Sequence, residues 1–380
     1  MGPRSQVVFL TGASGLLGGE TLRRMLAADP TLRAVVLVRG AGRWARVAAD
    51  LGIPTDRVAA VVGDVTQPGL GLDADVRRRL GRDVTVILHA AADVVFSRPI
   101  AVARAVNAEG TRHLLELAAA WPHARRFVYV STAFVAGRRV GRILEEEEGG
   151  AGEAGEAGVA GVAGGWVNAY EQSKHEAECL VRASDRDWLI LRPSTIVCDS
   201  IAGTVTQYNA VHLGLRLLYD SLAPMLPAVA TTGVDLVPRD YVAAALAALA
   251  TRAGLRQRTL HLCAGAGALP VGELLDLTWE GWSRGPEWRR RAVPRPTLAD
   301  IGTYRRFEAA VEETGDRDLR AAVRALSHFV PQLALPKQFD TTGADALLGE
   351  PAPAVRSYWP RLIDHLLSAR WAGAVKEVAA

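Results

Sequence analysis

Short runs of apolar residues alternate with amphipathic stretches through the first half of the chain. Each run is almost continuously apolar, is rich in Val and Ile, and is bounded by charge or glycine, which is typical of parallel strands buried on both faces. We expect strands at 7–11, 34–38, 58–62, 84–90, 126–131 and 188–193, and a later one at 259–264. Stretches of helical period, such as 15–29 and 101–120, separate the runs. This alternation predicts an α/β fold with a doubly wound parallel sheet.

The pattern changes after residue 198, where helical segments dominate. They cover 207–220, 241–251, 271–282, 318–329 and 359–371. We therefore predict a first domain over 1–198 and a smaller, mostly helical substrate-binding region over 199–380, from which 236–265 returns to the first domain. The segment 145–165 is of low complexity, rich in Gly, Ala and Glu, so we expect a mobile loop there, either a plain surface insertion or a lid.

Composition and charge exclude several classes of protein. The 380 residues are 49% hydrophobic and 22% charged, which excludes a largely disordered chain. A net charge of +3 is too small to predict nucleic-acid binding, and we interpret the basic run 287–296 as a solvated linker rather than a site for an acidic partner. Cys179, Cys198 and Cys263 lack the spacing of disulfides or metal sites, so we expect no metal and a reducing compartment. No apolar run resembles a signal peptide or a membrane span, so a cytoplasmic protein is expected.

Three glycines, Gly12, Gly15 and Gly18, stand between the first predicted strand and the first predicted helix. Glycine in these places allows a tight turn, close approach of a pyrophosphate to the backbone, and close packing of helix on strand. The helix then offers unpaired N–H groups and the positive end of its dipole to the phosphates. The pattern predicts a Rossmann-type dinucleotide-binding domain, with a plain glycine-rich turn as the alternative.

The end of the second predicted strand indicates which dinucleotide binds. A site for NAD usually has Asp or Glu there for the ribose 2′-hydroxyl, whereas this chain has Arg39, followed by Arg43 and Arg46. A guanidinium suits a 2′-phosphate through forked, charge-assisted hydrogen bonds, so we predict NADP rather than NAD; merely solvated arginines are the alternative. After the third and fourth strands, Asp64 and His89 are either cofactor contacts or local caps.

Tyr170 and Lys174 lie four residues apart, on one face of a predicted helix. An ammonium beside a phenol lowers the pKa of the phenol, so Tyr170 would be a proton donor near neutral pH. The fifth predicted strand ends at Ser131 and Thr132, and ligands bind at the carboxyl ends of strands in such sheets. An ordinary helical pair of Tyr and Lys is the alternative.

Taken together, these motifs resemble the extended short-chain dehydrogenase/reductases. The motifs that carry the resemblance are TGASGLLG, Asp64-Val65, HAAA, STAFVAG and YEQSK. Residues 91–118 and 191–203 resemble more closely the branch with a male-sterility type NAD-binding domain, which holds fatty acyl-CoA reductases and the thioester reductase domains of carboxylic acid reductases and peptide synthetases. The resemblance covers about residues 6–265 and leaves 270–380 unmatched.

The resemblance implies a catalytic set of Thr132, Tyr170 and Lys174, with Ser131 as the competitor of Thr132. Asn107 matches a family asparagine, and a structural hydrogen bond is its alternative role. The cofactor-binding positions that follow from the motifs and the resemblance are Gly12, Ser14, Gly15, Leu16, Leu17, Gly18, Arg39, Asp64, Val65, Ala90, Ala91, Ala92, Asn107, Tyr170, Lys174, Pro193, Ser194 and Ile196.

The resemblance implies an NADPH-dependent reductase that converts an acyl thioester, on coenzyme A or on an acyl or peptidyl carrier protein, to an aldehyde or alcohol. Nucleotide-sugar dehydratases resemble the chain less, because Ala133 and Phe134 stand where they carry Asp-Glu. Epimerases also fit less well, because Val197 and Cys198 replace their Tyr-Gly. Two alternatives stay open: an NADP-dependent ketone or alcohol oxidoreductase acting on a free small molecule, and a non-catalytic NADP-binding regulatory protein.

Overall fold

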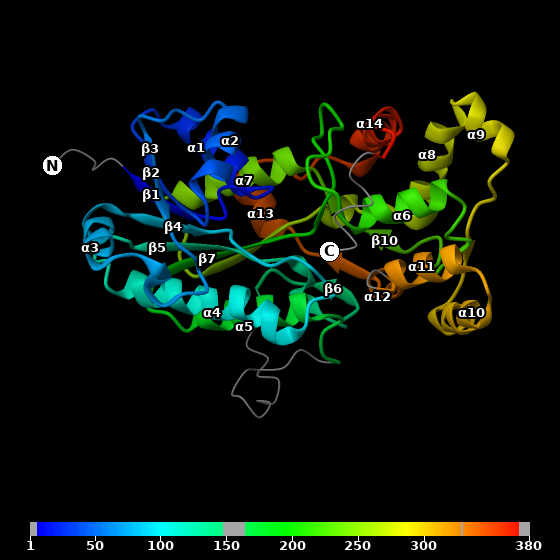
Figure 1. Ribbon diagram of the computed structural model, residues 1–380, viewed down its shortest axis with the longest axis horizontal. Coiled ribbons are helices and arrows are strands. Elements are labelled where there is room, and N and C mark those ends of the chain that lie inside the picture. The colour runs from blue at the N-terminus through cyan, green and yellow to red at the C-terminus, as the bar shows by residue number, and fades with distance from the viewer. Residues whose placement is uncertain (1–5, 147–163, 328–329, 372–380) are drawn as a thin grey trace.

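A seven-stranded parallel sheet forms the centre of one half of the molecule (Figure 1). The computed structural model describes residues 6–146, 164–327 and 330–371. In the order β12-β7-β5-β4-β1-β2-β3, the strands are Arg258–Leu262, Asp187–Pro193, Arg126–Val130, Val86–His89, Val7–Thr11, Arg33–Val38 and Val58–Val62. The predicted doubly wound sheet is confirmed. Its strand order reverses between β4 and β1, where the carboxyl ends of strands in such sheets open a crevice for ligands.

The sheet is buried on both faces, which explains its continuous apolar runs. In β1, Val8 and Leu10 belong to the core on one face, and Phe9 belongs to the core on the other. Helices α1 (Gly18–Ala28) and α7 (Arg239–Thr251) pack together over the first face, and α4 (Ile100–Ala119) and α5 (Ala169–Arg182) pack together over the second (Figure 1). Two shorter helices complete this half, α2 (Ala41–Asp50) and α3 (Ala74–Asp83).

One strand differs from its prediction. The run 58–62 reads as a buried strand, but β3 is the edge of the sheet and pairs only with β2. Ala59 and Ala60 are exposed, and Val62 is 61% exposed. Whether a strand lies at an edge depends on topology, so composition alone could not distinguish this strand from its neighbours.

Helices dominate the C-terminal half, as predicted, and most of them lie towards the end of the long axis away from the sheet, whereas the helix at 342–348 packs on α7 and β12 (Figure 1). They are α6 (Ala210–Tyr219), α8 (Val271–Ser283), α9 (Pro286–Arg291), α10 (Ile301–Glu313), α11 (Arg317–Leu326), α12 (Val330–Ala334), α13 (Thr342–Leu348) and α14 (Val355–Ser368). Strands of two or three residues form further pairs, both within the C-terminal half and with the sheet domain. These pairs are β6 (Gly141–Ile143) with β15 (Lys337–Phe339), β8 (Thr195–Ile196) with β11 (Leu236–Val237), β9 (Met225–Leu226) with β14 (Thr297–Leu298), and β10 (Gly233–Val234) with β13 (Leu269–Pro270). The late strand β12 joins the main sheet, while the division at residue 198 stays a prediction. Among the described residues, no helix has the length and apolar character needed to cross a bilayer.

The basic run 287–296 is not simply a solvated linker. Residues 286–291 form α9, and Trp288 is buried. Its ring stacks on Tyr219, with centroids 4.8 Å apart, and lies 4.7 Å from the ring of Trp282. The tryptophan inside the basic run was the signal for a packed helix, because a buried indole contributes a large apolar area.

The segment 145–165 begins with a buried residue rather than a loose loop. Glu145 accepts hydrogen bonds from the backbone N–H groups of Gly343 (2.7 Å) and Ala344 (3.1 Å), at the start of α13, and of His261 (2.9 Å), in β12. Burial raises the pKa of this carboxyl. The prediction of a mobile loop is therefore wrong at Glu145, and residues 147–163 lie outside the described residues.

Replacing Glu145 with glutamine is expected to lower the free energy of unfolding by about 1–2 kcal/mol, because an acceptor of buried N–H groups at a helix N-terminus is lost. Urea denaturation measures the change. Glu146→Gln is the matched control: its exposed ion pair with Arg258 contributes little to stability. Equal effects of the two substitutions would contradict the assigned role of Glu145.

Candidate active site

The glycine-rich turn between β1 and α1 packs directly against the loop that follows β4. Gly12 has a φ of +77°, and a Cβ atom there would lie 2.6 Å from the backbone of Ala90 and Ala91, so no larger residue fits. A Cβ atom at Gly18 would meet the carbonyl oxygen of Gly12. Leu17, which precedes α1, provides no side-chain cap for the first N–H groups of the helix. These features fit the pyrophosphate of a dinucleotide.

The other predicted positions of these two segments lie around the same turn. Ser14 and Leu16 are half-buried, and Gly15 is exposed and donates its N–H to the carbonyl of Gly12 at 2.9 Å. Residues 90–92 are half-buried after the end of β4. The structure thus places both predicted cofactor-binding segments at the point where the strand order reverses.

His89, at the end of β4, joins the sheet to a helix. Its Nδ1 lies 2.6 Å from the Thr11 hydroxyl and its Nε2 lies 3.1 Å from the Thr111 hydroxyl. Burial, with a smaller effect of the Lys174 charge, lowers the pKa of His89 to about 3, so the imidazole is neutral. The sequence left open whether His89 contacts the cofactor or has a local structural role, and these contacts support the local structural role.

Asp64 closes a turn after β3. One carboxylate oxygen accepts hydrogen bonds from the backbone N–H and the hydroxyl of Thr66, both at 2.9 Å. Val65 is buried beside α4, where a Cβ atom at Gly110 would lie 3.1 Å from the Val65 side chain. The structure shows the capping role of Asp64, and the contact with adenine stays a prediction.

Three arginines surround the carboxyl end of β2. Arg39 follows the strand directly, and Arg43 and Arg46 lie in the first two turns of α2. All three side chains are exposed. The end of β2 therefore presents positive charge beside the glycine-rich segment, since β1 and β2 are neighbours in the sheet.

Thr132 and Tyr170 bring two hydroxyl groups together. Thr132 follows β5 and its hydroxyl accepts a hydrogen bond from the N–H of Phe134, at 3.3 Å, as it caps a short 3₁₀ helix at 133–136. The Thr132 hydroxyl also lies near enough to the phenol of Tyr170 to act on its pKa, which it lowers. The ring of Tyr170 lies 5.5 Å from that of Phe96. This pair is the one that the sequence predicts.

The start of α5 fixes the position of Tyr170. Asn168 caps the helix by accepting the N–H of Glu171 at 3.0 Å, and Glu171 accepts the N–H of Val167 at 3.0 Å. An Asn followed three residues later by Glu is a sequence signal for a helix start. Tyr170 therefore occupies the first turn of a rigidly capped helix.

Lys174 lies one turn further along α5 and is 1% exposed. Its ammonium donates a hydrogen bond to the carbonyl oxygen of Val130 at 2.6 Å and lies 4.1 Å from the centre of the Tyr129 ring. Burial lowers the pKa of Lys174 to about 7, against the opposing effect of Glu178.

The structure corrects the expected effect of Lys174 on Tyr170. Burial raises the pKa of Tyr170 to about 12, although the Thr132 hydroxyl favours the phenolate. The Lys174 ammonium instead donates to the carbonyl of Val130 and lies over the ring of Tyr129. Tyr170 is therefore a protonated hydroxyl at neutral pH.

Asn107 links α4 to α5. Its amide donates to the Asp93 carbonyl (3.0 Å) and to the Ser173 hydroxyl (2.9 Å), and its oxygen accepts the N–H of Asp93 (2.8 Å). These contacts fit the structural role that the sequence left open. They hold α5, and with it Tyr170, against the loop after β4.

Sequence reasoning missed the ion pair behind Lys174. Glu178 binds Arg192 through two hydrogen bonds of 2.9 and 2.6 Å, and both side chains are buried. Burial opposes the charge of Glu178, but Arg192 lowers the pKa of this carboxyl, with a smaller contribution from Arg182. The signal was the spacing Tyr170-Lys174-Glu178, which places three polar residues on one helix face. The Ser131 hydroxyl is buried and has no hydrogen-bond partner among the described residues, so the choice of Thr132 over Ser131 stays a prediction.

The remaining predicted positions follow β7. Pro193 ends this strand, and Ser194 is buried and donates its N–H to the carbonyl of Leu262 at 3.3 Å. Ile196 lines a small pocket that Leu16 also lines, so the segment after β7 meets the glycine-rich turn. Within residues 6–146, 164–327 and 330–371, no three His, Cys, Asp or Glu side chains gather as a metal site would require.

Known proteins resemble this chain over most of its length. The family model described as Male sterility protein matches residues 10–246. The L-2-aminoadipate reductase large subunit of Penicillium chrysogenum is 30% identical over 261 residues, which is 62% of this chain and 18% of that protein. A putative fatty acyl-CoA reductase of Drosophila melanogaster is 28% identical over 273 residues, which is 62% of this chain and 50% of that protein. The chain thus spans half or less of the length of these relatives.

One solved structure covers almost the whole chain. The terminal R domain from the myxalamid PKS-NRPS biosynthetic pathway aligns with a TM-score of 0.74 and 24% sequence identity, over 98% of this chain and 93% of that one. At this level of identity, the likeness shows the fold.

Proposed function

Because this chain belongs to the male sterility protein family, as an oxidoreductase of the extended short-chain dehydrogenase/reductase type, we propose that it is an NADPH-dependent reductase of an acyl thioester on coenzyme A or a carrier protein. The observation that carries the proposal is that the Thr132 hydroxyl lies beside the phenol of Tyr170, with Lys174 one helical turn away. The names of the relatives, a fatty acyl-CoA reductase and a terminal R domain of a PKS-NRPS pathway among them, support the thioester class.

The residues present fit a nicotinamide dinucleotide. Gly12 and Gly18 allow a turn so tight that a Cβ atom at either would collide with neighbouring backbone, and this turn, beside the uncapped start of α1, would hold the pyrophosphate. Arg39 would bind the 2′-phosphate, and Tyr170 and Lys174 would bind the ribose beside the nicotinamide. When bound, NADPH supplies a hydride for the carbonyl carbon of the thioester.

The side chains of the site act on the carbonyl oxygen. Tyr170 and Thr132 donate hydrogen bonds to this oxygen as negative charge develops on it, and each well-placed donor is worth a few kcal/mol of transition-state stabilisation, about 3–4 kcal/mol in known cases. Tyr170 then gives its proton to the oxygen, which completes a hemithioacetal and is followed by reprotonation of Tyr170 from solvent. The C–S bond breaks, the sulfur takes the hydroxyl proton, and the products are a thiol and an aldehyde. Reduction of the aldehyde to an alcohol would take a hydride from a second NADPH and a second proton from Tyr170.

A substrate panel tests the proposal. Oxidation of NADPH is followed by its absorbance with acyl-CoA esters, with an acyl group on a carrier protein, and with free ketones. A thioester reductase consumes NADPH with one of the first two and releases free thiol, one for each NADPH if the product is an aldehyde and one for every two if it is an alcohol. Turnover of ketones alone would assign the chain to oxidoreductases of free small molecules, and NADPH binding without any turnover would indicate a regulatory protein.

Replacing Arg39 with aspartate is expected to weaken NADPH binding by about thirtyfold, or about 2 kcal/mol, because a charge-assisted hydrogen bond is replaced by repulsion of the 2′-phosphate. NADH binding should change little, since NADH lacks that phosphate. Titration of nicotinamide fluorescence measures both dissociation constants. Arg82→Asp, an equal charge change at an exposed position of α3, is the control. Equal affinity of the unmodified protein for NADPH and NADH would refute the preference.

A further inference from the structure

The loop that follows β4 carries a run of apolar residues. Val94, Val95 and Phe96 follow one another between β4 and α4, in a kind of segment that is normally polar. Val94 is 49% exposed, and the other two side chains are half-buried. Consecutive apolar residues that a surface loop leaves partly open are usually there for function.

Hydrogen bonds hold this loop in one conformation. The carboxylate of Asp93 accepts the N–H of Val95 at 3.0 Å and forms an ion pair with Arg98 at 3.5 Å. The side-chain amide of Asn107 bonds to both backbone polar groups of Asp93, and the N–H of Arg98 donates to the carbonyl of Val95 at 3.3 Å. The apolar side chains are therefore presented by a preorganised loop, which loses little conformational entropy when a ligand binds.

Phe96 connects the loop to the tyrosine of the candidate site. Its ring lies 5.5 Å from the ring of Tyr170, and the two planes are tilted by 33°. In the proposed reaction the Tyr170 hydroxyl binds the carbonyl oxygen of the thioester. The acyl chain is attached to the same carbonyl carbon, so it begins beside this pair of rings. The half-buried ring of Phe96 offers that chain an apolar surface.

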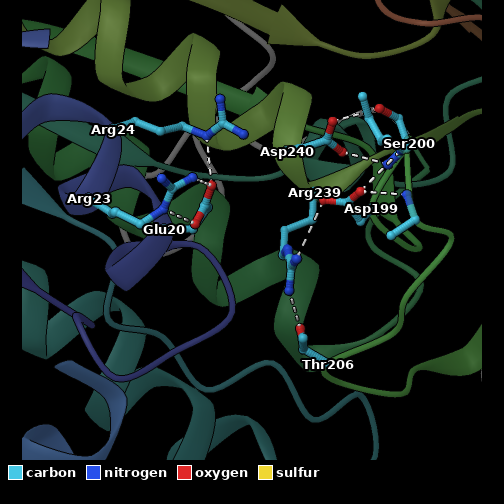
Figure 2. Close-up of polar contacts among 10 residues, drawn as sticks. Glu20, Arg23, Arg24, Asp199, Ser200, Thr206, Arg239 and Asp240 are labelled. Atoms are coloured by element: carbon cyan, nitrogen blue, oxygen red, sulfur yellow. Dashed lines mark hydrogen bonds and ion pairs between the residues drawn. The ribbon is translucent and has the colours of Figure 1, made fainter. Parts of the chain in front are cut away.

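Charged side chains beside the glycine-rich turn pair with one another (Figure 2). Glu20, in the first turn of α1, accepts hydrogen bonds of 2.6–2.8 Å from Arg23 and Arg24. At the start of α7, Arg239 forms an ion pair with Asp199 at 3.7 Å. These five side chains offer no free counter-ion to a charged acyl group, whereas a hydrocarbon chain needs only apolar contact.

We propose that Phe96 determines substrate specificity: its ring packs on the hydrocarbon chain of the acyl group and favours longer, uncharged chains over short or charged ones. The inference rests on the proposed function, because that function places the thioester carbonyl at Tyr170. Phe96 acts on binding of the chain rather than on the chemical step, so its contribution grows with the length of the chain.

Binding of unreactive thioethers tests the inference without turnover. S-ethyl, S-decyl and S-(2-carboxyethyl) pantetheine contain the part that coenzyme A and carrier proteins share, and calorimetry with NADP⁺ present gives their dissociation constants. The unmodified protein should bind the decyl compound most tightly and the carboxyethyl compound least tightly. Phe96→Ala is expected to raise the constant for the decyl compound about tenfold and that for the ethyl compound less than about twofold, because more of the longer chain packs on the ring.

Phe307→Ala is the matched control. Phe307 is also half-buried, and its ring lies 5.9 Å from the ring of Tyr304. Both residues belong to α10, at the end of the molecule away from the sheet (Figure 1). The substitution therefore removes an equivalent ring from a similar contact, and all three dissociation constants should stay as they are in the unmodified protein.

Three results would overturn the inference. The first is an equal loss of affinity for the ethyl and decyl compounds in Phe96→Ala, because Phe96 would then act through Tyr170 or the pantetheine arm. The second is decyl binding by the unmodified protein that is absent or no tighter than ethyl binding, and the third is carboxyethyl binding that is tighter than ethyl binding. Where Phe96→Ala fails to fold, Phe96→Leu should weaken decyl binding about threefold, and unchanged affinity would contradict the inference. A failure of the proposed function is separate, because it appears as the absence of thioester reduction by the unmodified protein.

Discussion

Replacing Tyr170 with phenylalanine is expected to lower turnover of an acyl thioester by about a hundredfold or more, the usual scale for losing a proton donor that also stabilises an oxyanion. The ring remains against Phe96, and the cap formed by Asn168 and Glu171 is untouched, so the fold should survive. NADPH binding should stay within a few fold, which separates loss of chemistry from loss of cofactor. Turnover under saturating NADPH and a fluorescence titration of the cofactor provide the two measurements.

Two hydroxyl variants refine this test. Thr132→Ala removes the hydroxyl beside the Tyr170 phenol, so turnover should fall while cofactor affinity stays. Ser131→Ala removes the neighbouring hydroxyl, which is buried and has no hydrogen-bond partner among the described residues, so its effect on turnover should be smaller. A larger defect in Ser131→Ala would move the catalytic hydroxyl by one residue. Near-normal turnover in Tyr170→Phe, with an active substrate, would contradict the proposed mechanism. Tyr170 and Lys174 would then be an ordinary pair of residues on one helix face.

The pKa of Tyr170 changes how this residue is understood. The sequence suggests a phenol whose pKa is lowered by Lys174, whereas burial raises it to about 12 in the protein. Tyr170 is thus fully protonated when a substrate arrives, and its first contribution is a hydrogen bond to the carbonyl oxygen. Proton transfer follows only after hydride addition has made that oxygen strongly basic.

The fold was predictable because its signals are local. Strands buried on both faces, such as β1 and β7, produce unbroken apolar runs whatever their neighbours are. The glycine-rich turn was equally readable, because Gly12 and Gly18 are required by contacts within a short segment and with the loop after β4. Thr132 and Tyr170 could be placed together because Thr132 directly follows the fifth strand and Tyr170 lies in the next long helix, an order that the family resemblance supplies.

The errors involve partners distant in the sequence. Glu145 belongs to a low-complexity acidic run, and only the fold reveals that residues near 343 supply its partners. The exposure of β3 depends on its place in the strand order. The sequence therefore did not predict contacts between residues that lie far apart in the chain.

The largest expected change in stability concerns the ion pair behind Lys174. Arg192→Met removes the cation from Glu178 and is expected to lower the free energy of unfolding by about 3–5 kcal/mol, because a buried carboxylate loses its partner. Arg182→Met is the matched control. Arg182 also contacts Glu178, at 3.3 Å, but its side chain is 38% exposed, so a loss of about 1 kcal/mol or less is expected.

The pH dependence of Arg192→Met should identify Glu178 as the cause. In the unmodified protein, the Glu178 pKa is lowered on folding, so the pair stabilises the protein above the pKa of the unfolded chain and loses this effect as the pH falls. Without Arg192, burial raises the folded pKa above the unfolded one, so ionisation opposes folding and the variant loses more stability at pH 8 than at pH 5. Adding Glu178→Gln to Arg192→Met should remove most of this difference between the two pH values. Urea denaturation at both values measures it, and a pH-independent loss of stability would attribute the damage to packing around Arg192 instead of to an unpaired charge.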